Sequence, residues 1–177
     1  MRITISGPPG SGKTTACKKL SERLGIRAVV FGEFFRKLAK ERGMTLSELG
    51  ALAEKDPSID KMIDSMILDV AVQDQNIILE SRLSAYMLTR NNIPAFRVYL
   101  DASPEVRMRR VGIREGEDPK EVCRHTIERQ SSEAKRYKMY YDIDIGDKSV
   151  YDLILNTDDL NPDQVVDRIL KAIEEST

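Results

Sequence analysis

The sequence has few of the residues that build cross-linked or metal-stabilised folds. Its 177 residues include two cysteines, one histidine and no tryptophan. Two cysteines are too few for a disulfide framework, and together with a single histidine they are too few for a structural zinc site. No apolar run approaches the length of a membrane span, and Arg2 is followed at once by a predicted strand, which leaves no room for a signal peptide. We therefore expect a cytoplasmic protein that does not enter a membrane.

The chain also lacks a strong net charge. It carries 28 Lys and Arg against 29 Asp and Glu, a formal net charge of −1 at pH 7. This balance gives no general attraction to nucleic acid or anionic lipid, so we expect neither as a partner. A length of 177 residues with 41% hydrophobic residues is enough for one self-sufficient core. We expect a single domain over 1–177 that acts as a monomer.

What the sequence does have is a complete glycine-rich motif near its start. Residues 7–14 read Gly-Pro-Pro-Gly-Ser-Gly-Lys-Thr and match G-x-x-x-x-G-K-[ST]. The motif lies between a β-branched run at 3–5 and a helical segment over 15–24, which is where a phosphate-binding loop must lie. Glycines allow the backbone N–H groups to turn inward towards a polyphosphate, and the helix dipole adds positive charge there. A glycine-rich turn that binds nothing is the alternative, and the full spacing argues against it.

Each part of this motif has an expected role. Lys13 would contact the β- and γ-phosphates of a bound nucleoside triphosphate, and the Thr14 hydroxyl would be a ligand of Mg²⁺. The predicted cofactor-binding residues are Gly7, Pro8, Pro9, Gly10, Ser11, Gly12, Lys13, Thr14 and Thr15.

Four more strands are predicted, at 27–31, 76–80, 96–101 and 153–156. They alternate with helical segments predicted over 33–42, from 46, from 57, over 84–92, from 104 to about 110 or 112, from 119 to about 140, and from 162. Such alternation indicates an α/β fold, the three-layer P-loop NTPase arrangement of a five-stranded parallel sheet with helices on both faces. Ligands of such sheets lie beyond the carboxyl ends of the strands, where the glycine-rich loop, Gly32, Glu80, Asp101 and Asn156 fall.

Two helix boundaries bear on function. A polar break over 114–117 is expected to end one helix, and a capping box formed by Asp118 and Glu121 is expected to start the next. In the helix opened by Asp56-Pro57, apolar residues recur at 59, 62, 63, 66, 67 and 70, which predicts one buried stripe that includes the methionines.

These segments together resemble the nucleoside monophosphate kinases, and most of all the compact, archaeal-type cytidylate kinases. The resemblance is carried by the loop at 7–14, Gly-Glu-Phe-Phe-Arg at 32–36, Leu-Glu-Ser-Arg-Leu at 79–83, the arginines from 107 to 114, and Arg129-x-x-x-Glu133-x-x-Arg136. The arginine spacing around Glu133 favours the cytidylate branch. The sequence departs from the family at Ser81, where glycine is more usual, and at Glu133, where aspartate is more usual.

The resemblance implies transfer of the γ-phosphoryl group of ATP to CMP and dCMP, with ATP and Mg²⁺ as cofactors and small-molecule nucleotides as partners. It implies a nucleotide-binding helical part over about 33–75 and a short lid over about 113–119. Arg36 and Arg82 would hold the acceptor phosphate with Glu80 and Glu133 as further substrate-binding residues, and Glu80 would reach Mg²⁺ through water.

The catalytic residues implied are cations. Lys13, Arg110 and Arg114 would hold the ATP phosphates, and Arg129 and Arg136 would bridge donor and acceptor. Guanidinium groups suit this chemistry because they bind phosphate at two points, and a nucleotide phosphate is already ionised at pH 7 and needs no base. We expect Arg107 and Arg109 to be solvated, and the base to be recognised around Arg82 and Ser84.

Other interpretations stay open at this point. Arg129, Glu133 and Arg136 lie at i, i+4 and i+7 and could form a surface ion-pair ladder instead. Adenylate or another small acceptor could replace CMP, and for a hydroxyl acceptor Glu33 could serve as the base. A nucleotide-dependent switch or regulatory ATPase is the non-kinase alternative, although the sequence has neither N-K-x-D nor D-x-x-G after a strand.

Overall fold

The computed structural model describes residues 1–176 as five parallel strands and eight helices. The strands are β1 (Arg2–Ser6), β2 (Arg27–Val30), β3 (Ile77–Glu80), β4 (Phe96–Asp101) and β5 (Leu153–Asn156). The helices are α1 (Lys13–Leu24), α2 (Phe31–Glu41), α3 (Leu46–Ala53), α4 (Pro57–Gln73), α5 (Ser84–Arg90), α6 (Pro104–Glu115), α7 (Pro119–Tyr141) and α8 (Pro162–Glu175).

The strands form one sheet in the order β2-β3-β1-β4-β5, and all four neighbouring pairs are parallel. The chain moves from β1 to β2 and β3 on one side of the sheet and then to β4 and β5 on the other. The glycine-rich loop that follows β1 therefore lies at the point where the strand order reverses, which is the usual ligand crevice of open parallel sheets. The predicted α/β P-loop fold is confirmed.

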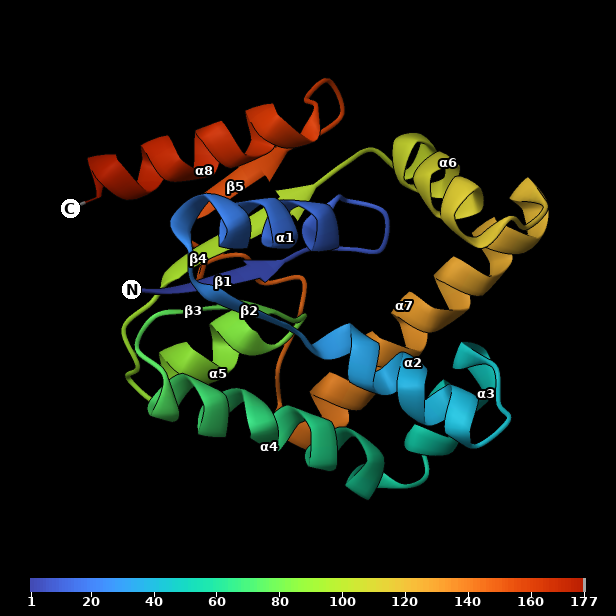
Figure 1. Ribbon diagram of the computed structural model, residues 1–177. Coiled ribbons are helices and arrows are strands. Elements are labelled where there is room, and N and C mark those ends of the chain that lie inside the picture. The colour runs from blue at the N-terminus through green and yellow to red at the C-terminus, as the bar shows by residue number, and fades with distance from the viewer. Residues whose placement is uncertain (177) are drawn as a thin grey trace.

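Helices cover both faces of the sheet (Figure 1). On one face α1 and α8 pack on the central strands, and the core there includes Ile3, Leu20, Val98 and Ile169. On the other face α4 and α5 lie with the end of α7, around Ile67, Leu79, Leu88 and Tyr137. These strands are apolar on both sides because both sides are covered, which is why their sequences read as continuous apolar runs.

A third, small core lies away from the sheet, where α2, α3 and α4 pack together around Leu49 and Ile59. In Figure 1 these helices extend beyond the carboxyl edge of the sheet and lie beside the long helix α7. Together they span the part that sequence similarity predicts to bind the acceptor. No helix in residues 1–176 is long and apolar enough to cross a membrane.

Two predicted boundaries at the start of this helical part are wrong. Phe31 belongs to α2 and not to the preceding strand, and Gly32 lies inside the first turn of α2. The ladder between β2 and β3 ends with Val30 opposite Glu80, and the Phe31 side chain is then buried beneath the sheet as the chain turns into the helix.

The predicted stripe on α4 is also partly wrong. The buried apolar residues recur every four positions at Ile59, Ile63, Ile67 and Ala71, whereas Met62 is 54% exposed. The stripe is narrower than expected because two aspartates, Asp60 and Asp64, take the buried positions beside it.

The third correction concerns the segment expected to form the lid. Helix α6 continues to Glu115, so Arg114 lies in its last turn and the break is limited to Gly116, Glu117 and Asp118. Gly116 ends the helix in the left-handed conformation, with φ of 66°. Asp118 caps α7 by accepting from Lys120 N, and the predicted reciprocal bond from Glu121 is replaced by a salt bridge to Arg124.

Candidate active site

The glycine-rich loop has the close-packed shape that its motif predicts. Gly7 has φ of 149°, and a Cβ there would lie 2.0 Å from the Leu100 carbonyl oxygen. Gly10 has φ of 81°, and a Cβ there would lie 2.5 Å from the Arg107 carbonyl oxygen. Both positions therefore exclude any side chain, and they let the loop fold back over the ends of β1 and β4 before α1 begins at Lys13.

Side chains from outside the loop donate hydrogen bonds to three consecutive carbonyl groups of the loop. Arg107 Nη1 donates to Pro9 O at 3.4 Å, Arg110 Nη1 to Gly10 O at 3.2 Å, and Thr157 Oγ1 to Ser11 O at 3.0 Å. Because a peptide unit is planar, a carbonyl fixed outward turns the following N–H the other way. These contacts support a loop whose N–H groups face a bound anion.

The contacts of Arg107 and Arg110 bear on two sequence-based expectations. The expectation that Arg107 is solvated is wrong, because its side chain is partly buried and also donates to Ala102 O at 3.1 Å. Arg110 does reach the loop, but its guanidinium also donates to Thr157 Oγ1 and Thr157 O, each at 2.9 Å. A direct contact between Arg110 and phosphate stays a prediction.

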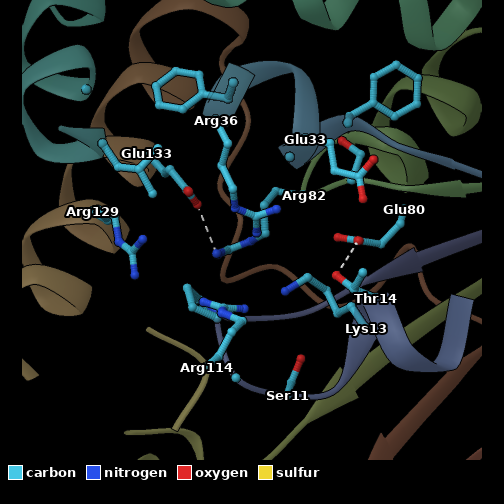
Figure 2. Close-up of a pocket in the computed structure, with 18 of the residues that line it drawn as sticks. Ser11, Lys13, Thr14, Glu33, Arg36, Glu80, Arg82, Arg114, Arg129 and Glu133 are labelled. Carbon is cyan, nitrogen blue, oxygen red and sulfur yellow. Dashed lines mark hydrogen bonds and ion pairs between the residues drawn. The ribbon is translucent and has the colours of Figure 1, made fainter. Parts of the chain in front are cut away.

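Lys13, Thr14 and Glu80 meet at the mouth of the loop (Figure 2). Lys13 Nζ donates to Pro8 O at 3.0 Å, and burial lowers the Lys13 pKa to about 8. Thr14 Oγ1 donates to Glu80 Oε2 at 2.9 Å, which brings a hydroxyl and a carboxylate from different elements to one point. Oxygen donors of this kind fit Mg²⁺, which binds few protein ligands and keeps most of its waters.

A cavity of about 1300 Å³ opens from the loop towards α2, α3, α4 and α7. Among residues 1–176, six arginines line it: Arg36 on α2, Arg82 after β3, Arg110 and Arg114 on α6, and Arg129 and Arg136 on α7. Figure 2 labels Arg36, Arg82, Arg114 and Arg129 around Lys13. The structure therefore brings together cations that lie far apart in the sequence, as the resemblance predicts.

Acidic side chains form salt bridges with three of the arginines labelled in Figure 2 and offset the repulsion between them. Arg82 pairs with Glu133 at 2.9 Å, while Glu115 accepts from Arg114 at 2.9 Å and from Arg129 at 3.5 Å. Glu115 thus joins the end of α6 to α7, a role that the sequence reading missed. Within residues 1–176, the Nε and Nη2 atoms of Arg129 are buried and have no hydrogen-bond partner. A buried guanidinium with unused donors fits a site for an anion.

The predicted alternative of an ion-pair ladder along α7 is wrong. Among the described residues, Arg129, Glu133 and Arg136 form no salt bridges with one another, and each pairs with a different element. Arg136 is buried and pairs with Asp60 at 2.7 Å. Its predicted contact with the transferring group stays a prediction.

Of the two residues around which base recognition was expected, Arg82 lines the cavity and Ser84 does not. Ser84 is fully buried, and its hydroxyl donates to Leu79 O and Ser81 O, each at 3.4 Å. Base recognition around Arg82 stays a prediction. Glu33, the candidate base for a hydroxyl acceptor, lines the cavity and lies 3.9 Å from Lys18 with more than half of its side chain exposed.

The site contains further residues that sequence reasoning did not single out. They are Asp60 and Asp64 on α4, Glu115 on α6, and Thr157 after β5. The sequence pattern does indicate the two aspartates, because they lie directly beside the apolar positions 59, 63 and 67 and so interrupt the buried face of an amphipathic helix. No sequence pattern indicates Glu115 and Thr157, since only the packing of α6 against α7 and the loop gives them their contacts.

Comparisons with known proteins agree with this geometry. A sequence model of the cytidylate kinase-like family matches residues 2–159. Cytidylate kinase of Archaeoglobus fulgidus is 41% identical over 174 residues, which cover 98% of this chain and 95% of that protein. Cytidylate kinase of Methanocorpusculum labreanum is 46% identical over 165 residues, covering 93% and 92% of the two chains.

Solved structures show the same fold at lower sequence identity. An uncharacterised protein of Eubacterium ventriosum superposes with a TM-score of 0.71 at 20% identity, covering 98% of each chain. Shikimate kinase of Bacteroides thetaiotaomicron superposes with a TM-score of 0.61, also at 20% identity and 98% coverage of each chain. The match of the family model over most of the chain, with relatives above 40% identity along nearly its full length, shows that this protein belongs to the cytidylate kinase-like family.

Proposed function

We propose that this enzyme transfers the γ-phosphoryl group of ATP to CMP, giving ADP and CDP, and that it accepts dCMP as a second substrate. One observation carries the proposal: a single cavity joins a complete phosphate-binding loop to a cluster of arginines, one of which, Arg129, has buried donors without partners among residues 1–176. Membership of a family whose named relatives are cytidylate kinases supports CMP over the alternatives of adenylate or a non-kinase switch.

Different residues would bind the donor phosphates, the acceptor phosphate and the transferring group. The loop over 7–15 and Lys13 hold the donor phosphates, and Arg36 and Arg82 hold the phosphate of CMP. Arg114 and Arg129, joined through Glu115, offset the charge that spreads over the transferring group. An oxygen of the CMP phosphate forms the new bond to the γ-phosphorus, and the bond from that phosphorus to the β-phosphate oxygen breaks. No base is required because the acceptor phosphate is already ionised.

Thr14 and Glu80 would hold Mg²⁺, Thr14 directly and Glu80 through water. The hydrogen bond between their side chains places both at the end of the loop, beside Lys13. When bound there, Mg²⁺ supplies positive charge to the phosphates of ATP. Glu133 keeps Arg82 in place beside the acceptor phosphate through the 2.9 Å salt bridge. Monomeric state and cytoplasmic location stay predictions.

A panel of acceptors tests the proposal. The purified protein is assayed with ATP and Mg²⁺ against CMP, dCMP, UMP, AMP and shikimate, and product nucleotides are resolved by chromatography. We expect CDP and dCDP to form fastest. A preference for AMP would identify an adenylate kinase, transfer to a hydroxyl would direct attention to Glu33, and ATP hydrolysis without any transfer would favour a regulatory ATPase.

A further inference from the structure

A single buried hydroxyl lies where four segments meet beside the phosphate loop. Thr157 follows β5 at its carboxyl end, and only 2% of the residue is exposed. Its Oγ1 accepts from Arg110 Nη1 at 2.9 Å, and it lies 3.0 Å from Ser11 O and 3.1 Å from Asp101 O. The hydroxyl therefore connects the end of β5 to the phosphate loop, to the end of β4 and to α6, although these segments lie far apart in the sequence.

The proton of this hydroxyl is available to the phosphate loop. A threonine hydroxyl has one proton to donate and two lone pairs that accept. Asp101 O already accepts from Thr157 N at 2.8 Å, which extends the pairing of β4 with β5 by one residue. Donation to Ser11 O leaves a lone pair for Arg110 Nη1. Arg110 Nη2 donates to Thr157 O at 2.9 Å, so the guanidinium holds this residue at two points.

The bond to Ser11 O bears on where a donor phosphate would bind. Ser11 O and the N–H of Gly12 belong to one planar peptide unit, so an oxygen fixed towards Thr157 turns that N–H the opposite way. Gly12 lines the cavity just before α1, and a Cβ there would have nothing within 4 Å. Space for an anion thus adjoins Gly12 at the N-terminus of α1, where the helix dipole favours negative charge.

A comparison with a second threonine argues against a hydroxyl that only satisfies itself. Thr4 on β1 is also fully buried, and its Oγ1 has no hydrogen-bond partner within residues 1–176. The fold thus tolerates an unpaired threonine hydroxyl in the strand that leads to the same loop. Asp101 O alone would be enough to satisfy the Thr157 hydroxyl, so its contacts with Ser11 and Arg110 exceed what burial requires.

We propose that the Thr157 hydroxyl is a positioning group for the phosphate donor. It orients the peptide between Ser11 and Gly12 so that the Gly12 N–H faces the bound phosphates, and it holds Arg110 beside the loop. Thr157 acts through these groups and does not itself contact the nucleotide. The inference rests on the proposed function in taking ATP as the donor, and it is independent of which acceptor receives the phosphoryl group. Loss of the hydroxyl should therefore weaken donor binding and spare the acceptor.

Replacing the hydroxyl with a methyl group tests this role. Thr157→Val keeps the shape of the side chain and leaves Ser11 O and Arg110 Nη1 without this partner. Binding of ADP with Mg²⁺ is measured by calorimetry without an acceptor, and the KM values for ATP and CMP are measured by steady-state kinetics. We expect at least about tenfold weaker ADP binding and a similar rise in the KM for ATP, with less than about a twofold change in the KM for CMP.

Two variants provide matched controls. Thr157→Ser keeps the hydroxyl and should retain most of the ADP affinity. Thr4→Val removes a buried hydroxyl that has no partner among the described residues, and it should leave ADP binding and both KM values unchanged. If Thr157→Val fails to fold, Thr157→Cys takes its place, because a thiol is only a weak donor and should give the same pattern on a smaller scale.

The possible results separate this inference from the proposed function. Unchanged ADP affinity in the folded Thr157 variant would overturn the positioning role. An equal rise in the KM values for ATP and CMP would also overturn it, because a purely structural contact would affect both ends of the cavity alike. Failure of the unmodified enzyme to bind ADP would overturn both the inference and the proposed function, whereas intact ADP binding without phosphorylation of CMP would overturn only the choice of acceptor.

Discussion

The two ends of the cavity are built in opposite ways. At the donor end, the loop over 7–14 and the start of α1 would form an anion site made largely of main chain, with the side chains of Lys13, Thr14 and Glu80 at its mouth. At the acceptor end, side chains from α2, α4, α7 and the segment after β3 converge from positions up to 100 residues apart. The first kind of site can be recognised from a short motif, and the second exists only once the helices have packed.

The largest expected effect belongs to the donor end. Lys13→Ala should lower kcat/KM at least about 1000-fold while leaving the fold intact, because Lys13 contributes charge to the phosphates and not apolar contact to the core. Steady-state kinetics and far-ultraviolet circular dichroism of the same preparation check this.

Lys171→Ala is the matched control for the loss of a lysine charge, since Lys171 is exposed on α8, away from the cavity. Its activity should equal that of the unmodified enzyme. Loss of the folded signal together with activity in Lys13→Ala would show that the loop is needed for folding and would contradict the separation of roles.

The second prediction separates the roles of Arg129 and Arg136, which both lie on α7. Arg129→Ala should lower kcat about 100-fold with little change in the KM for CMP, because buried, unused donors are available to the charge that develops in the transition state. Arg136→Ala should lower kcat less than Arg129→Ala does, because its guanidinium is already paired with Asp60. Kinetics of both variants with CMP, UMP and AMP distinguish the two.

Equal losses of kcat in both arginine variants would favour the original sequence-based hypothesis, in which both residues bridge donor and acceptor. Unchanged kinetics in both would mean that they only support the packing of α7. Either result would remove the distinction between the roles of Arg129 and Arg136.

The third prediction concerns stability at the acceptor end. Burial raises the pKa of Asp64 from 3.8 to about 7, so between these values the folded state binds more protons than the unfolded state. The contribution of Asp64 to the free energy of unfolding therefore falls as pH rises from about 4 to 7, by an amount on the order of a few kcal/mol. Asp64→Asn removes the ionisation and keeps an oxygen for the Tyr141 hydroxyl. It should stabilise the protein at pH 8 and have little effect at pH 4.

Urea unfolding of Asp64→Asn and the unmodified protein at pH 4, 6 and 8 measures this effect. Asp69→Asn, exposed on the same helix, provides the control for a change of net charge. A stability difference that stays constant with pH would mean that Asp64 titrates near its ordinary value and that the acceptor end is more open to water than the structure indicates.

The smallest effect is expected for motion between the two ends. The segment over 113–119 should close only when donor and acceptor are both bound, because Glu115 at the end of α6 joins Arg114 to Arg129, two cations proposed to act on the transferring group. Limited proteolysis with and without a bisubstrate analogue should show a several-fold slower cleavage there. Equal cleavage in both states would leave the lid without support.

Several elements were predicted correctly from the sequence, and the reason is physical. Strand β4 and the starts of α3 and α8 agree with the structure, because a strand between covered faces and the first residue of a helix depend on neighbouring residues. The end of α6 was placed too early, because Gly112 and the polar residues after it resemble a helix stop. Packing of α6 against α7 and the loop carries the helix to Gly116 instead.

The sequence by itself determined the parallel sheet, the phosphate loop and the order of the arginines, since these follow from periodicity and from a motif whose spacing its chemistry requires. Tertiary structure alone decided which acid holds which arginine. The i, i+4 and i+7 spacing on α7 left an ion-pair ladder among Arg129, Glu133 and Arg136 open as an alternative, but these residues pair with Glu115, Arg82 and Asp60. Buried charges take the partners that packing brings within hydrogen-bonding distance, and distance along the chain does not encode that choice.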